Sequence, residues 1–195
     1  MKAQIYRFKI TYDEYGDKIN RTVEVSSNYT LANLGFLVLA AFDTLAYHLF
    51  YISYNGKRFE IPLDEDDFGE PAADPREVRL NTLGLNTGDA MEMVYDFGGE
   101  QTFRIVLDGI YEMPKGTSTA YPKIIAGAGK GILDDVAPYD FGEIIKKIDK
   151  TGKSDHVYLS PYGTEEQWDY REFDIEEANR TLKRDISAIA QGFEE

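Results

Sequence analysis

A period-two alternation of apolar and polar residues recurs through the first half of the chain and constrains its fold more than any other feature. It covers residues 4–11, 19–25, 90–97 and 102–107, and an aromatic, β-branched stretch covers residues 48–54. Alternation of this kind is typical of β-strands that bury one face. The pair Asn55-Gly56 follows the aromatic stretch and favours a hairpin turn. We therefore expect the first half of the chain to build a sheet.

Three segments have helical periodicity instead. The first begins after Thr30, whose hydroxyl can cap a helix, and repeats apolar residues up to position 41. The other two follow Asp140 and Asp174, each with a glutamate three residues later, as in a capping box. Residues 111–133 are rich in glycine and proline and weakly patterned, so we expect an irregular segment there.

The order of these elements resembles the β-grasp arrangement, in which a hairpin precedes a packed helix. We expect an α+β fold in which residues 1–110 form a β-grasp-like (ubiquitin-like) mixed sheet with one packed helix. Residues 111–195 are expected to add the irregular segment and two amphipathic helices. These would form a C-terminal helical extension packed on the core, within a single domain overall.

The charge of the chain bears on its partners. The net charge is −14, from 21 basic and 35 acidic residues. Affinity for nucleic acid depends on neutralising phosphates, so we do not expect nucleic-acid binding. The acidic residues are concentrated at positions 64–74, within an expected loop over residues 62–77. This acidic loop is expected to be a solvated surface excursion, with a docking surface for a basic partner or a weak divalent-cation site as alternatives.

Composition and motif spacing exclude several kinds of site. The chain has no cysteine and two histidines, which rules out disulfides, iron–sulfur clusters and thiol nucleophiles. Residues 126–131 lack the spacing of a phosphate-binding loop, and residues 64–75 lack the final glutamate of a calcium-binding loop. We therefore expect no cofactor and no dedicated metal motif. The longest apolar run is 34–42 and no signal-peptide stretch is visible, so we expect a soluble cytoplasmic protein.

Short motifs in a fixed order resemble the plasmid pRiA4b ORF-3-like family along almost the whole chain. They are Thr30-Leu31-Ala32-Asn33-Leu34, His48-Leu49-Phe50-Tyr51-Ile52, Tyr95-Asp96-Phe97-Gly98, the acidic pair Asp134-Asp135, and an ending that runs from Trp168 to Leu182. The chain departs from the family pattern after Gly98. Gly99, Gln101 and Phe103 stand where the family has Asp, Trp and His, and the family's cysteine is absent.

The resemblance implies a candidate cluster and leaves the function open. The cluster comprises His48, Tyr95, Asp96, Gly98, Asp134 and Asp135. Because several polar positions of the family are lost here, the resemblance favours a non-enzymatic binding or interaction module with an unknown protein partner. One alternative is a metal-assisted, hydrolase-like enzyme that uses Asp96, Asp134 and Asp135 with His48, which requires these groups to converge in one cleft. A second is a mobile-element DNA-processing accessory protein, as labels carried by some family members suggest.

Overall fold

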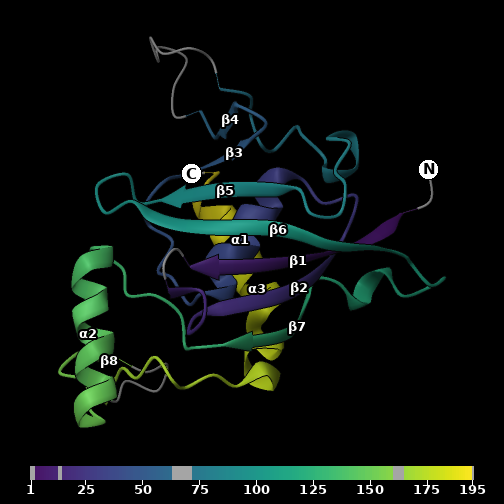
Figure 1. Ribbon diagram of the computed structural model, residues 1–195. Helices are drawn as coiled ribbons and strands as arrows, with labels where there is room; N and C mark the ends of the chain where they lie inside the picture. The colour runs from purple at the N-terminus through teal and green to yellow at the C-terminus, as the bar shows by residue number, and fades with distance from the viewer. Residues whose placement is uncertain (1–2, 13–14, 63–71, 160–164, 195) are drawn as a thin grey trace.

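A seven-stranded sheet forms the centre of the computed structural model, which describes residues 3–12, 15–62, 72–159 and 165–194 (Figure 1). The strand order is β4-β3-β5-β6-β1-β2-β7. The strands are β1 (Gln4–Tyr12), β2 (Asn20–Ser26), β3 (Phe50–Tyr54), β4 (Lys57–Glu60), β5 (Ala90–Tyr95), β6 (Gln101–Glu112) and β7 (Lys123–Ala128). A separate two-stranded sheet pairs β8 (Val157–Leu159) with β9 (Glu165–Gln167).

All ladders between these named strands are antiparallel. The α+β class is therefore confirmed, whereas the expected mixed sheet is wrong and the β-grasp assignment is not confirmed. The physical reason is that alternation reports which face of a strand is buried. It carries no information on the direction or identity of the neighbouring strand.

Two helices cover one face of the large sheet, and a third stands at its end (Figure 1). The three are α1 (Leu31–Ala41), α2 (Pro138–Thr151) and α3 (Ile175–Gly192), and short 3₁₀ turns are η2 (Leu80–Thr82) and η3 (Ser118–Ala120). Helices α1 and α3 pack together, with α3 also against β7. None of the helices in the described ranges has the length and apolar character that a bilayer crossing requires.

The helix caps agree with the sequence at two of three positions. The Thr30 hydroxyl accepts a hydrogen bond from the Asn33 N–H, and the Asp174 carboxylate accepts from the second and third N–H groups of α3. Helix α2 instead begins at Pro138, with Ala137 as its cap, so the predicted cap at Asp140 is wrong. Proline at the first helical position loses no hydrogen bond, and its fixed φ suits the helix.

Strand β7 lies within the segment that we expected to be irregular. The glycine in this strand is required by close packing, because a Cβ at Gly127 would meet the Asn20 carbonyl oxygen of β2 at 2.8 Å. Ile124 is buried, and the Asn179 side chain on α3 bonds both its N–H and its carbonyl oxygen, at 2.8 Å each. This edge strand is therefore held by one amide side chain on a helix, a contact that leaves no trace in strand periodicity.

A buried arginine ties the sheet to two irregular segments. Arg21 on β2 donates to the carbonyl oxygens of Ala41, Asn20, Ala128 and Lys130 at 2.7–3.1 Å. Its guanidinium also lies 3.9 Å from the centre of the Phe173 ring. Burial lowers the pKa of Arg21 to about 10, so the group stays charged at neutral pH. Arg21 thus fixes the end of α1 and the end of β7, from which the site segments begin.

The acidic loop is described only in part. Residues 63–71 lie outside the described residues, so its docking and cation-binding interpretations stay predictions. In the described part, Asp74 forms an ion pair with Arg76 at 2.6 Å.

Candidate functional site

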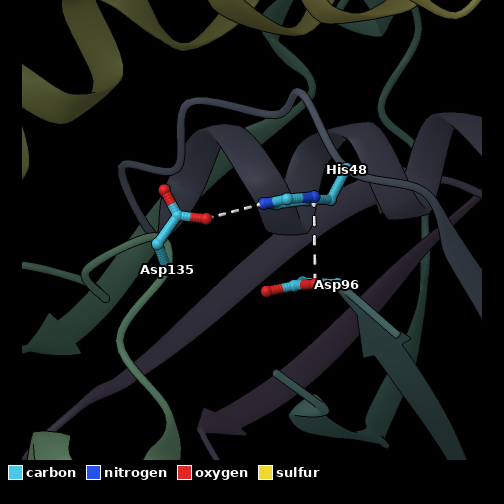
Figure 2. A group of neighbouring side chains, drawn as sticks. All are labelled: His48, Asp96 and Asp135. Atoms are coloured by element: carbon cyan, nitrogen blue, oxygen red, sulfur yellow. Dashed lines mark hydrogen bonds and ion pairs between the residues drawn. The ribbon is translucent and has the colours of Figure 1, made fainter. Parts of the chain in front are cut away.

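Three of the predicted residues come together at one end of the sheet. His48 lies on the segment between α1 and β3, Asp96 directly follows β5, and Asp135 lies between β7 and α2 (Figure 2). Strands β3 and β5 are antiparallel partners with Phe50 opposite Tyr95, and the Asp96 N–H extends the ladder to the Leu49 carbonyl oxygen at 3.0 Å. This pairing places His48 beside Asp96, although 47 positions separate them in the sequence.

The imidazole of His48 lies between the two carboxylates (Figure 2). Its Nε2 is 3.0 Å from Asp135 Oδ1, and its Nδ1 is 3.8 Å from Asp96 Oδ1. One ligand atom from each of the three residues lies within 4.8 Å of the other two. Asp135 is 66% exposed, whereas Asp96 is largely covered. The cluster is therefore open to solvent on one side.

The turn after β5 determines the position of the Asp96 carboxylate. Asp96 has φ +56°, and its Oδ1 accepts the Gly98 N–H at 3.1 Å. A Cβ at Gly99 would meet Asp96 Oδ2 at 2.6 Å. A side chain at Gly99, where the family has Asp, would therefore displace the carboxylate from its present position. The Gly98 N–H thus donates a hydrogen bond to the Asp96 carboxylate, and the missing side chain of Gly99 leaves room for that carboxylate.

Tyr47 is a member of the site that the sequence analysis missed. Its hydroxyl donates to Asp135 Oδ2. This hydrogen bond, followed by the one with His48, lowers the pKa of Asp135, and the same bond to Asp135 raises the pKa of Tyr47 to about 12. The only signal in the sequence was its position next to His48. An exposed aromatic residue in a loop has no pattern that marks it as a carboxylate partner.

Asp134 and Tyr95 form a separate pair beside the cluster. The Tyr95 hydroxyl donates to Asp134 Oδ1 at 2.6 Å, and the Leu45 N–H donates to Asp134 Oδ2 at 2.9 Å. Tyr95 is fully buried, and this burial, with the bond to Asp134, raises its pKa. The predicted set therefore divides into a cluster of His48, Asp96 and Asp135 and a supporting pair.

Two of the positions at which the chain departs from the family pattern, Gln101 and Phe103, make structural contacts. Gln101 is buried, its Nε2 donates to the Val136 carbonyl oxygen at 2.7 Å, and its Oε1 accepts from the Tyr12 hydroxyl. Phe103 is buried in the core, with its ring centre 4.9 Å from that of Phe42. Gln101 therefore supports the segment that carries Asp135, and Phe103 contributes packing.

The fold and the site define an α+β protein with an antiparallel sheet that carries a His–Asp–Asp cluster at one end. The chain belongs to the plasmid pRiA4b ORF-3-like family, whose model matches residues 4–177. The resemblance that the sequence motifs indicated is thereby confirmed.

The fold is also similar to a solved structure. This is the crystal structure of a protein of unknown function from Methanosarcina mazei Go1, with a TM-score of 0.71 and 19% sequence identity over 90% of this chain and 97% of that chain. At this identity the similarity shows the fold alone. None of the curated proteins compared with the chain matches it.

Proposed function

We propose that the protein binds a divalent cation through His48, Asp96 and Asp135, and that this site serves a binding role. The observation that carries the proposal is the convergence of one imidazole and two carboxylates from three separate segments, with ligand atoms within 4.8 Å of one another. Ligands on three segments meet only in the folded chain, so the site would be coupled to folding.

The donor set favours a transition-metal ion. Imidazole nitrogen suits Zn²⁺, Fe²⁺, Ni²⁺ and Cu²⁺, whereas Mg²⁺ and Ca²⁺ prefer oxygen donors alone. Two carboxylates and a neutral imidazole carry two negative charges, which a divalent ion balances. Three protein ligands leave at least one coordination position open for water or for a group of a partner.

The surroundings favour a role in binding a protein partner. Two apolar side chains on the His48 segment are exposed, Leu45 at 72% and Tyr47 at 53%, and Phe97 beside Asp96 is 40% exposed. Exposed aromatic side chains next to a polar centre are typical of interfaces between proteins. We propose that a partner protein docks on these side chains and completes the coordination of the ion.

Metal-assisted hydrolysis is the second candidate function. It is favoured by the open coordination position, because a metal-bound water can become a nucleophile at neutral pH. In this version His48, Asp96 and Asp135 hold the ion, and Asp134 takes no part as a ligand. Hydrolysis of ester, phosphoester or peptide substrates by the Co²⁺-loaded protein, lost in Asp135→Asn, would favour this candidate over the binding role.

A thermal-shift series tests the proposal. The wild-type protein is heated with Zn²⁺, Co²⁺, Mn²⁺, Mg²⁺ or Ca²⁺, alongside His48→Ala, Asp96→Asn and Asp135→Asn. An ion present at 100 times its Kd stabilises the folded state by about 2.7 kcal/mol. We expect stabilisation by the transition ions in the wild type and little response in the three variants. Equal responses in wild type and variants, or none to any ion, would contradict the proposal.

Asp149→Asn is the matched control for this series. Asp149 lies on α2, and it accepts hydrogen bonds from the Tyr170 hydroxyl and from Lys18 Nζ. This control removes a carboxylate that also accepts two hydrogen bonds but lies outside the cluster. The response of Asp149→Asn to the ions should therefore equal that of the wild type.

A further inference from the structure

We propose that Asp134 is a positioning residue for the His48–Asp96–Asp135 cluster and is not itself a ligand. The inference rests on the proposed function, because it assigns a role at the same cation site. It also corrects the expectation that Asp134 belongs with Asp96 and Asp135 as a functional carboxylate.

Each oxygen of Asp134 accepts a hydrogen bond from another segment of the protein. Oδ1 accepts from the Tyr95 hydroxyl at 2.6 Å, and Oδ2 accepts from the Leu45 N–H at 2.9 Å. Asp134 is not among the residues whose ligand atoms lie within 4.8 Å of one another. Its carboxylate therefore serves as an acceptor for two protein donors.

These two contacts join the three segments that carry the cluster. Tyr95 directly precedes Asp96, Leu45 lies three positions before His48, and Asp134 directly precedes Asp135. A single carboxylate therefore links the end of β5, the segment between α1 and β3, and the segment between β7 and α2. Outer contacts of this kind orient metal ligands, and their loss typically lowers metal affinity by about 10- to 100-fold.

The segments that carry Tyr95 and Leu45 differ in how firmly their other contacts hold them. Tyr95 is fixed in the core, because its side chain is fully buried and its strand pairs with both β3 and β6. Leu45 is 72% exposed, so its side chain gives its segment no packing anchor. Ala46 in the same segment has φ +56°, a conformation that persists in non-glycine residues only when surrounding contacts determine it. The Leu45 N–H bond to Asp134 is such a contact.

Neighbouring contacts hold the Asp134 segment without reaching Leu45. The Ile132 N–H donates to the Phe42 carbonyl oxygen at 3.0 Å, and Gln101 donates to the Val136 carbonyl oxygen. These two bonds place the backbone on either side of Asp134. The Asp134 side chain then transfers that placement to the segment of His48 and to β5.

A Tyr95→Phe variant separates positioning from ligation by the direction of its effect. If Asp134 positions the cluster, loss of the Tyr95 hydroxyl weakens cation binding. If Asp134 were a fourth ligand, the same change would free its Oδ1 for the ion, and binding would stay equal or strengthen. Phenylalanine keeps the buried ring, so this variant retains the core packing.

The experiment is a Co²⁺ titration followed by calorimetry and visible absorption. Asp134→Ala, which removes both contacts, and Tyr95→Phe should each weaken binding by about 10- to 100-fold, the range found for outer-shell partners of metal ligands. Both should keep the shape of the wild-type Co²⁺ spectrum, because the ligands are unchanged. Asp135→Asn should change that spectrum or abolish it. Asp149→Asn, the control carboxylate, should leave both affinity and spectrum unchanged.

The possible results distinguish the two proposals. Wild-type affinity in Tyr95→Phe, or a new spectrum in Asp134→Ala, overturns the positioning role while the cation site stands. Absence of Co²⁺ binding by the wild type overturns the proposed function and this inference together. If Asp134→Ala fails to fold by circular dichroism, Tyr95→Phe decides alone.

Hydrogen exchange gives a second readout that needs no metal. The Leu45 amide should exchange about tenfold faster or more in Asp134→Ala than in the wild type, because its acceptor is lost, and Asp149→Ala should leave it unchanged. An unchanged exchange rate at Leu45 in Asp134→Ala would contradict the link between the segments.

Discussion

Left-handed backbone conformations are concentrated next to the cluster. Six described non-glycine residues have positive φ, and four of them lie in the segments of the cluster, namely Asp43, Ala46, Asp96 and Asp135, with φ between +56° and +61°. Two of these residues are proposed ligands and the other two lie in the segment that carries His48. Such conformations cost roughly 1 kcal/mol or more each and are commonly found where function constrains the backbone.

An Asp96→Gly variant tests separately the two features of this residue, its positive φ and its carboxylate. Glycine adopts the positive φ without strain, so stability should change by no more than about 1 kcal/mol. Cation binding should be lost, because the carboxylate is gone. Urea unfolding and calorimetric titration check the two expectations. A large loss of stability with cation binding intact would show that Asp96 is a purely structural turn residue.

Arg21 is the residue on which the placement of both loop segments depends. Replacing it with methionine keeps most of the volume but leaves four carbonyl oxygens without their donor, so we expect a loss of about 3–5 kcal/mol in unfolding free energy. Arg184→Met is the control, because Arg184 is exposed and forms an ion pair with its neighbour Asp185; we expect a change within about 0.5 kcal/mol. Equal effects in the two variants would contradict this role.

At the scale of elements, the edge strand β7 depends on α3 through Asn179. The Asn179 amide donates to the carbonyl oxygens of Ile124 and Ile175, and its Oδ1 accepts the Ile124 N–H. The side chain thus takes the place of a neighbouring strand at this edge, which otherwise presents unpaired backbone groups.

Asn179→Ala should therefore lower stability more than an average surface change. We expect a loss of about 1–3 kcal/mol, because the Ile124 N–H loses its acceptor in a partly buried place. Denaturant unfolding gives the value, and hydrogen exchange at Ile124 should accelerate. The exposed neighbour Arg180, changed to alanine, is the control. An Asn179→Ala protein as stable as Arg180→Ala would show that β7 is held by other contacts.

The elements show what sequence patterns can and cannot predict. The alternation at residues 4–11 and 102–107 predicted strands that the structure contains, and Thr30 and Asp174 were identified as caps. Strand β7 was missed because Gly127, which packs closely against Asn20 of β2, resembles a loop residue in the sequence. The pairing of β3 with β5, which brings His48 to Asp96, depends on contacts between distant residues that no local pattern contains.

The candidate site could be predicted only in part from the sequence. Motifs singled out His48, Asp96, Asp134 and Asp135. Nothing in the sequence indicated that Asp134 binds Tyr95 and Leu45 rather than joining the cluster. Neighbouring residues in a turn point in different directions, so Asp134 and Asp135 could not be assigned separate roles from their order alone.

For the molecule as a whole, several exposed or half-exposed aspartates are kept charged by local partners, whereas burial raises the pKa of Asp43. Hydrogen bonds from Tyr170 and then Lys18 lower the pKa of Asp149, and a hydrogen bond from Arg171 lowers that of Asp169. A carboxylate with a lowered folded-state pKa stabilises the fold above its unfolded pKa. That contribution is lost as the pH falls through the folded value.

Stability should therefore decrease as the pH falls below about 4, near the unfolded pKa of aspartate. Asp149 is 43% exposed, so solvent limits its own contribution to less than about 1 kcal/mol. In Asp149→Asn the acid-dependent part of the stability curve should be shallower than in the wild type. Urea unfolding between pH 7 and pH 2.5 measures the difference. A steeper acid dependence in this variant would contradict the assigned direction.

Anomalous diffraction from a crystal of the protein grown with Co²⁺ would locate a cation bound where His48, Asp96 and Asp135 meet. We expect one strong peak within about 2.0–2.2 Å of an imidazole nitrogen of His48 and of oxygens from both aspartates. Asp134 should remain bonded to Tyr95 and Leu45 in that crystal. A cluster without a peak would show that these residues hold no cation, and a peak coordinated by Asp134 would show that Asp134 is a ligand.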